Sequence, residues 1–164
     1  MLKITIVIFT ILGSLLLATA FAENDILLEA AKKYETHGMS GSVFISDTGN
    51  QLYLVSVGFK DVASDNPNDI LNARKVAKTA AKRGLSKFIH NTKVTSNETI
   101  KSDIRSIVTY KNNKLVKLER SEQLRYDSII AEKGEGALNK IIEVGSWKFE
   151  NSFFLVLAIK IDKN

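Results

Sequence analysis

The 164-residue chain contains no cysteine, and it has only one proline, one tryptophan and two histidines. Without cysteine it can form no disulfide bond and cannot carry the lipid of a lipoprotein, so its stability must come from an ordinary hydrophobic core. A metal site would depend on His37 and His90, which are far apart in the sequence and form no metal-binding motif. We therefore expect no metal ion and no cofactor.

The first 22 residues have the three parts of a secretory signal peptide. A lysine precedes an apolar run over residues 4–17, and Ala20 and Ala22 match the small-residue pattern of a cleavage site. We expect cleavage after Ala22, which leaves residues 23–164 as a single domain in the periplasm or outside the cell. After cleavage, the protein should touch a membrane only peripherally. The alternative is a retained anchor, because the apolar run has about the length of a short spanning helix.

The formal net charge of the chain is +5, which is a mild excess of basic residues. Such a charge suits an acidic partner protein or an anionic surface of the cell envelope. No nucleic-acid-binding motif accompanies it, so we do not expect nucleic acid as a partner.

Three elements are predicted in the first half of the chain. Apolar residues at helical spacing predict a short amphipathic helix over residues 26–35. Residues 42–46 and 51–59 are rich in β-favouring side chains and flank a turn, which predicts a hairpin. Asp69 is a good N-cap for a long helix that should end near residue 91.

The long helix has two contrasting faces. Small and apolar residues predict a face that lies flat against a sheet: Ile70, Ala73, Ala77, Ala80, Ala81, Gly84, Leu85 and Phe88. The other face is basic and is the candidate binding surface: Arg74, Lys75, Lys78, Lys82, Arg83 and Lys87. Six cations on one surface could meet an acidic partner, and the alternative is a solvated face that keeps the protein soluble.

The second half of the chain is predicted to complete the sheet. Residues 92–96 and 99–110 favour strand, and residues 114–131 fit either helix or strand. Gly134 and Gly136 should interrupt the chain before a strand over residues 139–149. Residues 153–161 are apolar on both faces and should form a central strand. We expect an α+β fold, with one long helix packed across an antiparallel sheet of four or five strands and a short N-terminal helix.

The strand end at residues 57–59, the alanine-rich helix at 72–86, the segment 94–96 and the closing hairpin with Trp147 before residues 154–158 form a familiar pattern. It resembles small bacterial envelope proteins typified by the twenty-kilodalton outer-membrane lipoproteins, and the related N-terminal domain of flagellar assembly protein T. The resemblance implies a long helix on an antiparallel sheet, a role in the envelope or an appendage, and no catalytic residues. The chain departs from the family in lacking the lipoprotein cysteine.

The preferred functional prediction is an exported, non-enzymatic envelope protein that serves as an assembly or protein-binding module. One alternative is a small-molecule or lipid-binding protein whose pocket is lined by Met39, Phe59, Phe88 and Trp147. A weaker alternative is a small hydrolase built on Ser40 and His37. The segment around Ser40 lacks the second glycine of a nucleophile elbow, and a helix leads into a strand there, which is the reverse of that motif.

Overall fold

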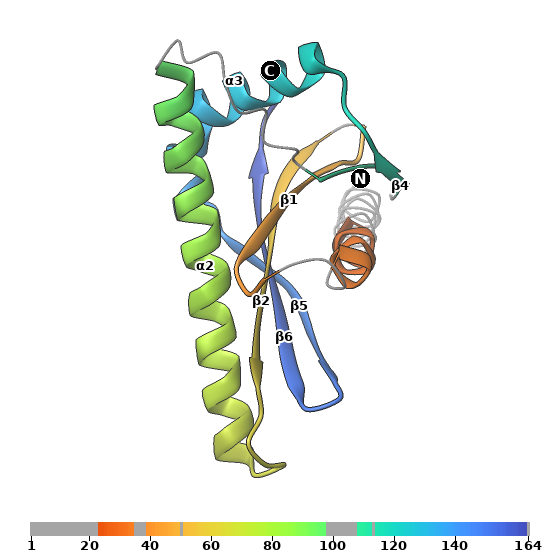
Figure 1. Ribbon diagram of the computed structural model, residues 1–164, viewed down its shortest axis with the longest axis vertical. Coiled ribbons are helices and arrows are strands. Elements are labelled where there is room, and N and C mark those ends of the chain that lie inside the picture. The colour runs from red at the N-terminus through yellow and green to blue at the C-terminus, as the bar shows by residue number, and fades with distance from the viewer. Residues whose placement is uncertain (1–22, 35–38, 50, 98–107, 113, 164) are drawn as a thin grey trace, which may run out of the picture.

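The computed structural model describes residues 23–34, 39–49, 51–97, 108–112 and 114–163 of the chain. A helix over residues 23–34 is followed by β1 (Ser42–Asp47), β2 (Leu52–Asp61), α2 (Pro67–Asn97), β3 (Thr109–Lys111), β4 (Lys114–Val116), α3 (Arg120–Ala137), the 3-10 turn η1 (Leu138–Lys140), β5 (Ile142–Phe149) and β6 (Ser152–Ile161). Helices lie on both sides of one sheet (Figure 1). The expected α+β class is confirmed, and the longest helix packs on the sheet as expected.

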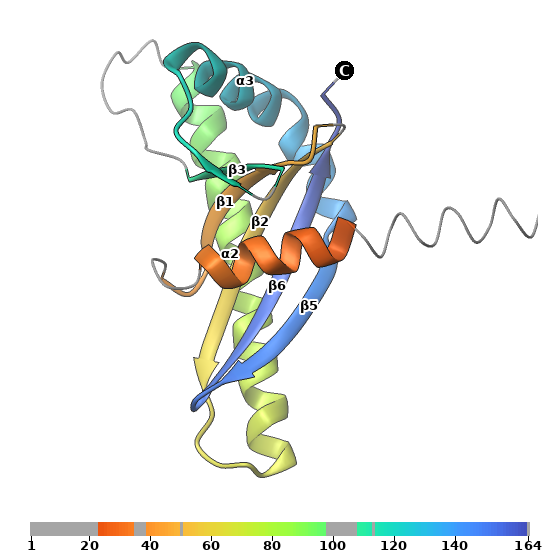
Figure 2. The ribbon, with the colours of Figure 1, turned by 90° about the vertical axis from the view of Figure 1, so that its right-hand side faces the viewer.

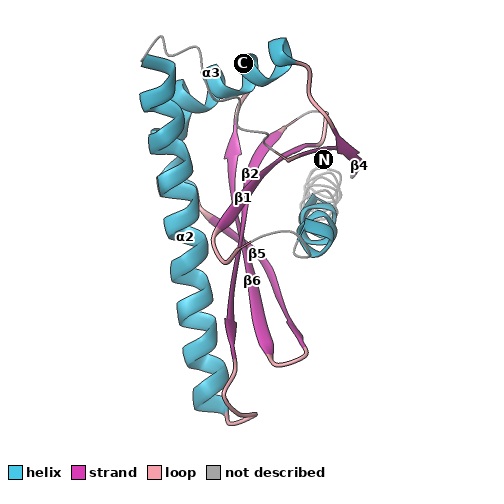
Figure 3. Ribbon diagram, viewed as in Figure 1, coloured by secondary structure: helices cyan, strands magenta, loops and turns pink. Residues whose placement is uncertain are grey.

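The sheet has six strands in the order β4-β3-β1-β2-β6-β5. Figure 3 draws the strands in magenta. The expectation of four or five strands was wrong because β3 and β4 have only three residues each, too few to show an alternating pattern. The expectation of a purely antiparallel sheet was also wrong. The chain crosses over through α2 after β2, so β3 enters beside β1 in the parallel direction.

Helix α2 packs closely against β2 and β6. The buried residues of its sheet-facing side follow a spacing of four: Ala73, Ala77, Ala81, Leu85 and Ile89. At two points the backbones themselves meet. A Cβ on Gly58 would stand 1.9 Å from the carbonyl oxygen of Ala77, and a Cβ on Gly84 would stand 2.0 Å from that of Gly41. The predicted flat packing of a small-residue face is therefore confirmed.

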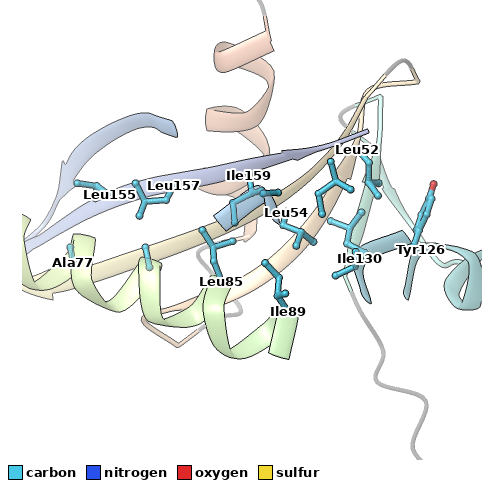
Figure 4. Packing of buried hydrophobic residues seen from close by; sticks show 14 residues of the cluster. Leu52, Leu54, Ala77, Leu85, Ile89, Tyr126, Ile130, Leu155, Leu157 and Ile159 are labelled. Carbon is cyan, nitrogen blue, oxygen red and sulfur yellow. The ribbon is translucent and has the colours of Figure 1, made fainter. Parts of the chain in front are cut away.

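The larger hydrophobic cluster fills the space between the sheet, α2 and α3 (Figure 4). Side chains of β2 and β6 meet Leu85 and Ile89 of α2 together with Ile130 of α3. Gly134 of α3 allows this contact, because a Cβ there would stand 2.9 Å from the Ile89 side chain. The expectation that Gly134 and Gly136 interrupt the chain was wrong, since both lie inside α3.

Two further boundaries differ from expectation. α2 continues to Asn97, so residues 92–96 are helical and do not form a strand. Thr92 fits there because it is buried and its hydroxyl donates a hydrogen bond to the carbonyl oxygen of Phe88 at 2.8 Å. The ambiguous stretch 114–131 contains both elements, first β4 and then α3. The strand expected from residue 139 begins at Ile142, after η1.

The helix of residues 23–34 covers the opposite face of the sheet from α2, which Figure 2 shows in orange. Leu27, Ala30 and Ala31 are fully buried against a second cluster that includes Phe44 and Val156. The predicted amphipathic helix is confirmed, and it forms part of the folded domain. The protein thus has three layers, with α2 and α3 on one side, the sheet in the middle and this helix on the other side.

Candidate functional site

The six cations of the predicted basic face all lie on α2, and the structure divides them into two groups. Arg74 and Lys78 both bind Glu143 of β5, with Nη2 of Arg74 at 2.7 Å from Oε1 and Nζ of Lys78 at 2.9 Å from Oε2. The hydrogen bond from Lys78, with the one from Arg74, outweighs partial burial and lowers the pKa of the Glu143 carboxyl. These two ion pairs therefore link α2 to β5 at the edge of the sheet.

The other group consists of four exposed side chains: Lys75, Lys82, Arg83 and Lys87. Within the described residues, none of the four makes an ion pair. Asp69 is the only acidic residue of α2, and it lies in the first turn. The outward face is thus a row of cations without a neutralising carboxylate, and we refer to these four residues as the outer basic row.

The geometry of the outer basic row follows from helical spacing. Lys75 and Arg83 are eight residues apart, which is about 12 Å along the helix, and Lys87 is one further turn away. Leu71 and Val76 are 50% and 41% exposed beside the row. A partner could therefore neutralise several charges along α2 and cover some apolar surface, without any deep pocket.

The residues proposed to line a pocket do not come together. Phe88 packs against the cluster beneath α2, whereas Phe59 and Trp147 belong to the opposite face of the sheet. Met39 is 84% exposed. Trp147 stacks against Phe154 with ring centres 5.0 Å apart, and Lys32 lies 5.9 Å from the Trp147 ring. Trp147 and Phe59 therefore both pack against Phe154, on the opposite face of the sheet from Phe88.

The hydroxyl of Ser40 is occupied by backbone groups. It donates a hydrogen bond to the carbonyl oxygen of Phe59 and accepts one from the Phe59 N–H, both at 2.8 Å. Through these two hydrogen bonds, Ser40 connects the loop before β1 to the end of β2. Its proposed partner His37 lies outside the described residues, and His90 is an exposed residue within α2 rather than at its end.

One polar cluster was missed by the sequence reasoning. Asp47 at the end of β1 accepts hydrogen bonds from the Tyr126 hydroxyl at 2.6 Å, the Lys163 ammonium at 2.6 Å and the Gly49 N–H at 2.7 Å. Burial raises the pKa of Asp47, but the three donors outweigh it and hold that pKa below its usual value. Burial and the nearby carboxylate raise the pKa of Tyr126.

The Asp47 cluster joins β1, α3 and the segment after β6. Every oxygen and nitrogen that forms it has a partner, and Asp47 itself is only 8% exposed. A satisfied buried cluster of this kind fixes the arrangement of chain segments. No local motif marks these residues, because the three side chains are up to 116 positions apart in the sequence.

A shallow cavity of about 270 Å³ lies where β2 ends and α2 begins. It is lined by polar and small apolar residues: Lys60, Asp61, Val62, Ala63, Asp69, Asn72 and Ala73. Among the described residues, no group of three or more histidine, aspartate or glutamate side chains converges in a way that could hold a metal ion.

No protein family, curated protein or solved structure matches this chain. The resemblance to envelope lipoproteins therefore stays a prediction. Across the part of the chain that the structure describes, no helix is long and apolar enough to cross a membrane.

Proposed function

We propose that the protein is an exported, non-enzymatic module of the cell envelope, and that it binds an acidic partner protein through the outer basic row of α2. The observation that carries this proposal is the row itself: Lys75, Lys82, Arg83 and Lys87 are exposed and make no ion pair with a described residue. Beyond Asp69 in its first turn, α2 carries no acidic side chain, which supports an external source of negative charge.

The helix is well suited to serve as a binding surface because it is held rigidly. Its inner face contacts the backbone of β2 at Gly58, and Gly84 of the helix contacts the backbone at Gly41 before β1. Arg74 and Lys78 are fixed by Glu143. Because the helix backbone is already fixed, only the lysine and arginine side chains of the row lose conformational freedom when a partner binds. The signal-peptide pattern predicted over residues 1–22 supports a location in the periplasm or outside the cell.

The experiment is crosslinking in cells that express the full tagged chain, followed by identification of the attached protein. The test variant carries Lys75→Glu, Arg83→Glu and Lys87→Glu, which leave the Glu143 ion pairs intact. The matched control carries Lys114→Glu, Lys117→Glu and Lys140→Glu, which make the same change in net charge at exposed positions outside α2. A discrete acidic envelope protein should be captured by the parent and the control but not by the test variant.

Ionic strength provides the second measurement. Binding through exposed charges should weaken as salt is added, because screening shortens the range of the interaction to about 8 Å at physiological ionic strength. Equal crosslinking of all three proteins would contradict the proposal. Capture by anionic lipid vesicles alone, with no protein adduct, would instead identify the envelope surface as the partner.

A further inference from the structure

The sheet has one long open edge. Among the residues that the structure describes, the eight-residue strand β5 pairs only with β6, whereas the opposite edge is formed by the three-residue strand β4. Two large apolar side chains are exposed along β5, with Ile142 at 41% and Phe149 at 58%. A long edge strand with exposed apolar residues is a template for pairing with another strand.

An irregularity in β5 sets which residues share a face. The register against β6 shifts between Glu143 and Gly145, so Val144 is an extra residue in a β-bulge. Glu143, Ser146 and Lys148 consequently lie opposite the β6 residues that face α2. Ile142, Gly145, Trp147 and Phe149 share the other face of the sheet.

We propose that two copies of the chain pair through β5, antiparallel, with a two-fold axis at Ser146. In this register Ser146 lies opposite Ser146 of the second copy, and the bulge at Val144 and Gly145 lies opposite Trp147. The extra residue shifts the remaining pairs by one position. Lys148 then lies opposite Glu143, and Phe149 lies opposite Ile142.

The strand is complementary to itself in this register. Residues directly opposite each other in an antiparallel pair share a face, and each of these pairs meets that condition because of the bulge. Lysine meets glutamate on the face of α2, and phenylalanine meets isoleucine on the other face. Without the bulge, an antiparallel pair centred on Ser146 would place Lys148 opposite Val144 and leave Glu143 opposite Phe149.

The pairing also extends ion pairs that already exist in one copy. Glu143 is bound by Arg74 and Lys78, and Lys148 is bound by Asp65. Bringing Lys148 of the second copy beside Glu143 joins these groups into one network across the interface. The two six-stranded sheets become continuous, and the two α2 helices lie antiparallel on the same face.

The chain offers a sensitive test because it has no cysteine of its own. In the dimer, Ser146→Cys places two thiols opposite each other across the two-fold axis, at a Cα separation of about 4.5–5.5 Å that a disulfide can span. Lys148→Cys is the matched control on the same strand and face. Its thiol would stand about 13 Å from its symmetry mate, too far for a disulfide.

The protein purified from cells that express the full chain should therefore form a covalent dimer on mild oxidation when it carries Ser146→Cys, and should form no covalent dimer with Lys148→Cys. No covalent dimer from Ser146→Cys would overturn the proposal. Equal dimer yields from both variants would overturn it too, because random collision would then explain the disulfide.

Sedimentation tests the charge pairing without any disulfide. The parent protein should sediment with twice the mass of one chain. Lys148→Glu places like charges opposite each other at two symmetric positions and should raise the dimer dissociation constant about tenfold. Lys114→Glu on β4 makes the same charge change at the other edge and should leave the constant unchanged. A parent protein that stays monomeric at every concentration, or equal effects of both variants, would refute the pairing.

Discussion

Gly84 and Gly136 both lie inside helices, yet replacement by alanine should have opposite effects at the two positions. A Cβ on Gly84 would stand 2.0 Å from the carbonyl oxygen of Gly41, whereas a Cβ on Gly136 would meet nothing within 4 Å. Alanine stabilises a helix relative to glycine by about 0.5–1 kcal/mol. The steric clash is therefore the main difference between the two substitutions.

The size of the destabilisation by Gly84→Ala depends on which parts of the structure must move to relieve the clash. Both sides of the clash at Gly84 are backbone, so α2 would have to withdraw from the sheet by roughly 1 Å. That movement would loosen the packing of Ala81 and Leu85, which are both fully buried. Overpacking of this kind costs about 1–3 kcal/mol, and rigid backbone places it at the upper end. After the gain in helix propensity, Gly84→Ala should destabilise the fold by about 2 kcal/mol.

Thermal unfolding followed by circular dichroism measures the difference. A change of 1 kcal/mol shifts the Tm of a chain of this size by about 3 °C, so Gly84→Ala should melt about 6 °C below the parent. Gly136→Ala should melt up to about 3 °C above it. A Gly84→Ala protein that is as stable as the parent would refute the backbone contact between α2 and the loop before β1.

Three further predictions concern the two buried regions. Asp47→Asn removes the charge that binds Lys163 and Tyr126, so urea unfolding at neutral pH should show a loss of about 2 kcal/mol. The pKa of Asp47 is lower in the folded state than in the unfolded chain. The stabilisation that its charge provides is therefore fully present above the usual carboxyl pKa of 3.8, and it is lost as the pH falls through the pKa of the folded state. The stabilities of the parent and Asp47→Asn should therefore converge on acidification, and a constant difference down to low pH would contradict the cluster. Leu27→Ala should destabilise the fold by about 2–5 kcal/mol in the same urea assay, because Leu27 is fully buried, and the exposed Lys32→Ala should have little effect.

The elements predicted correctly from the sequence are those with a long, regular pattern. The stripe of small residues from Ala73 to Leu85 identified the face of α2 that contacts the sheet. Residues 153–161 are apolar on both faces, and β6 lies between two strands with helices on either side. The hairpin of β1 and β2 has β-favouring strands joined by a turn with a positive φ at Gly49.

The elements missed from the sequence depend on partners far along the chain. Gly134 suggested an end to regular structure, but it serves as the point where α3 approaches Ile89. The three-residue strands β3 and β4 exist because β1 offers them an edge. For the candidate surface, composition identified the cations of α2. It could not show that Arg74 and Lys78 are already bound by Glu143, 69 and 65 residues away.

The position of β6 has a consequence for the order in which the protein folds. β6 is the last strand in the chain, yet it pairs with β2 and contributes to the hydrophobic clusters on both faces of the sheet. A chain that is synthesised from its N-terminus can form the first hairpin early. It cannot complete either hydrophobic cluster until β6, which ends at residue 161, has also been made. Non-local pairing of this kind delays cooperative folding. The topology thus delays the closure of both hydrophobic clusters until the chain is nearly complete.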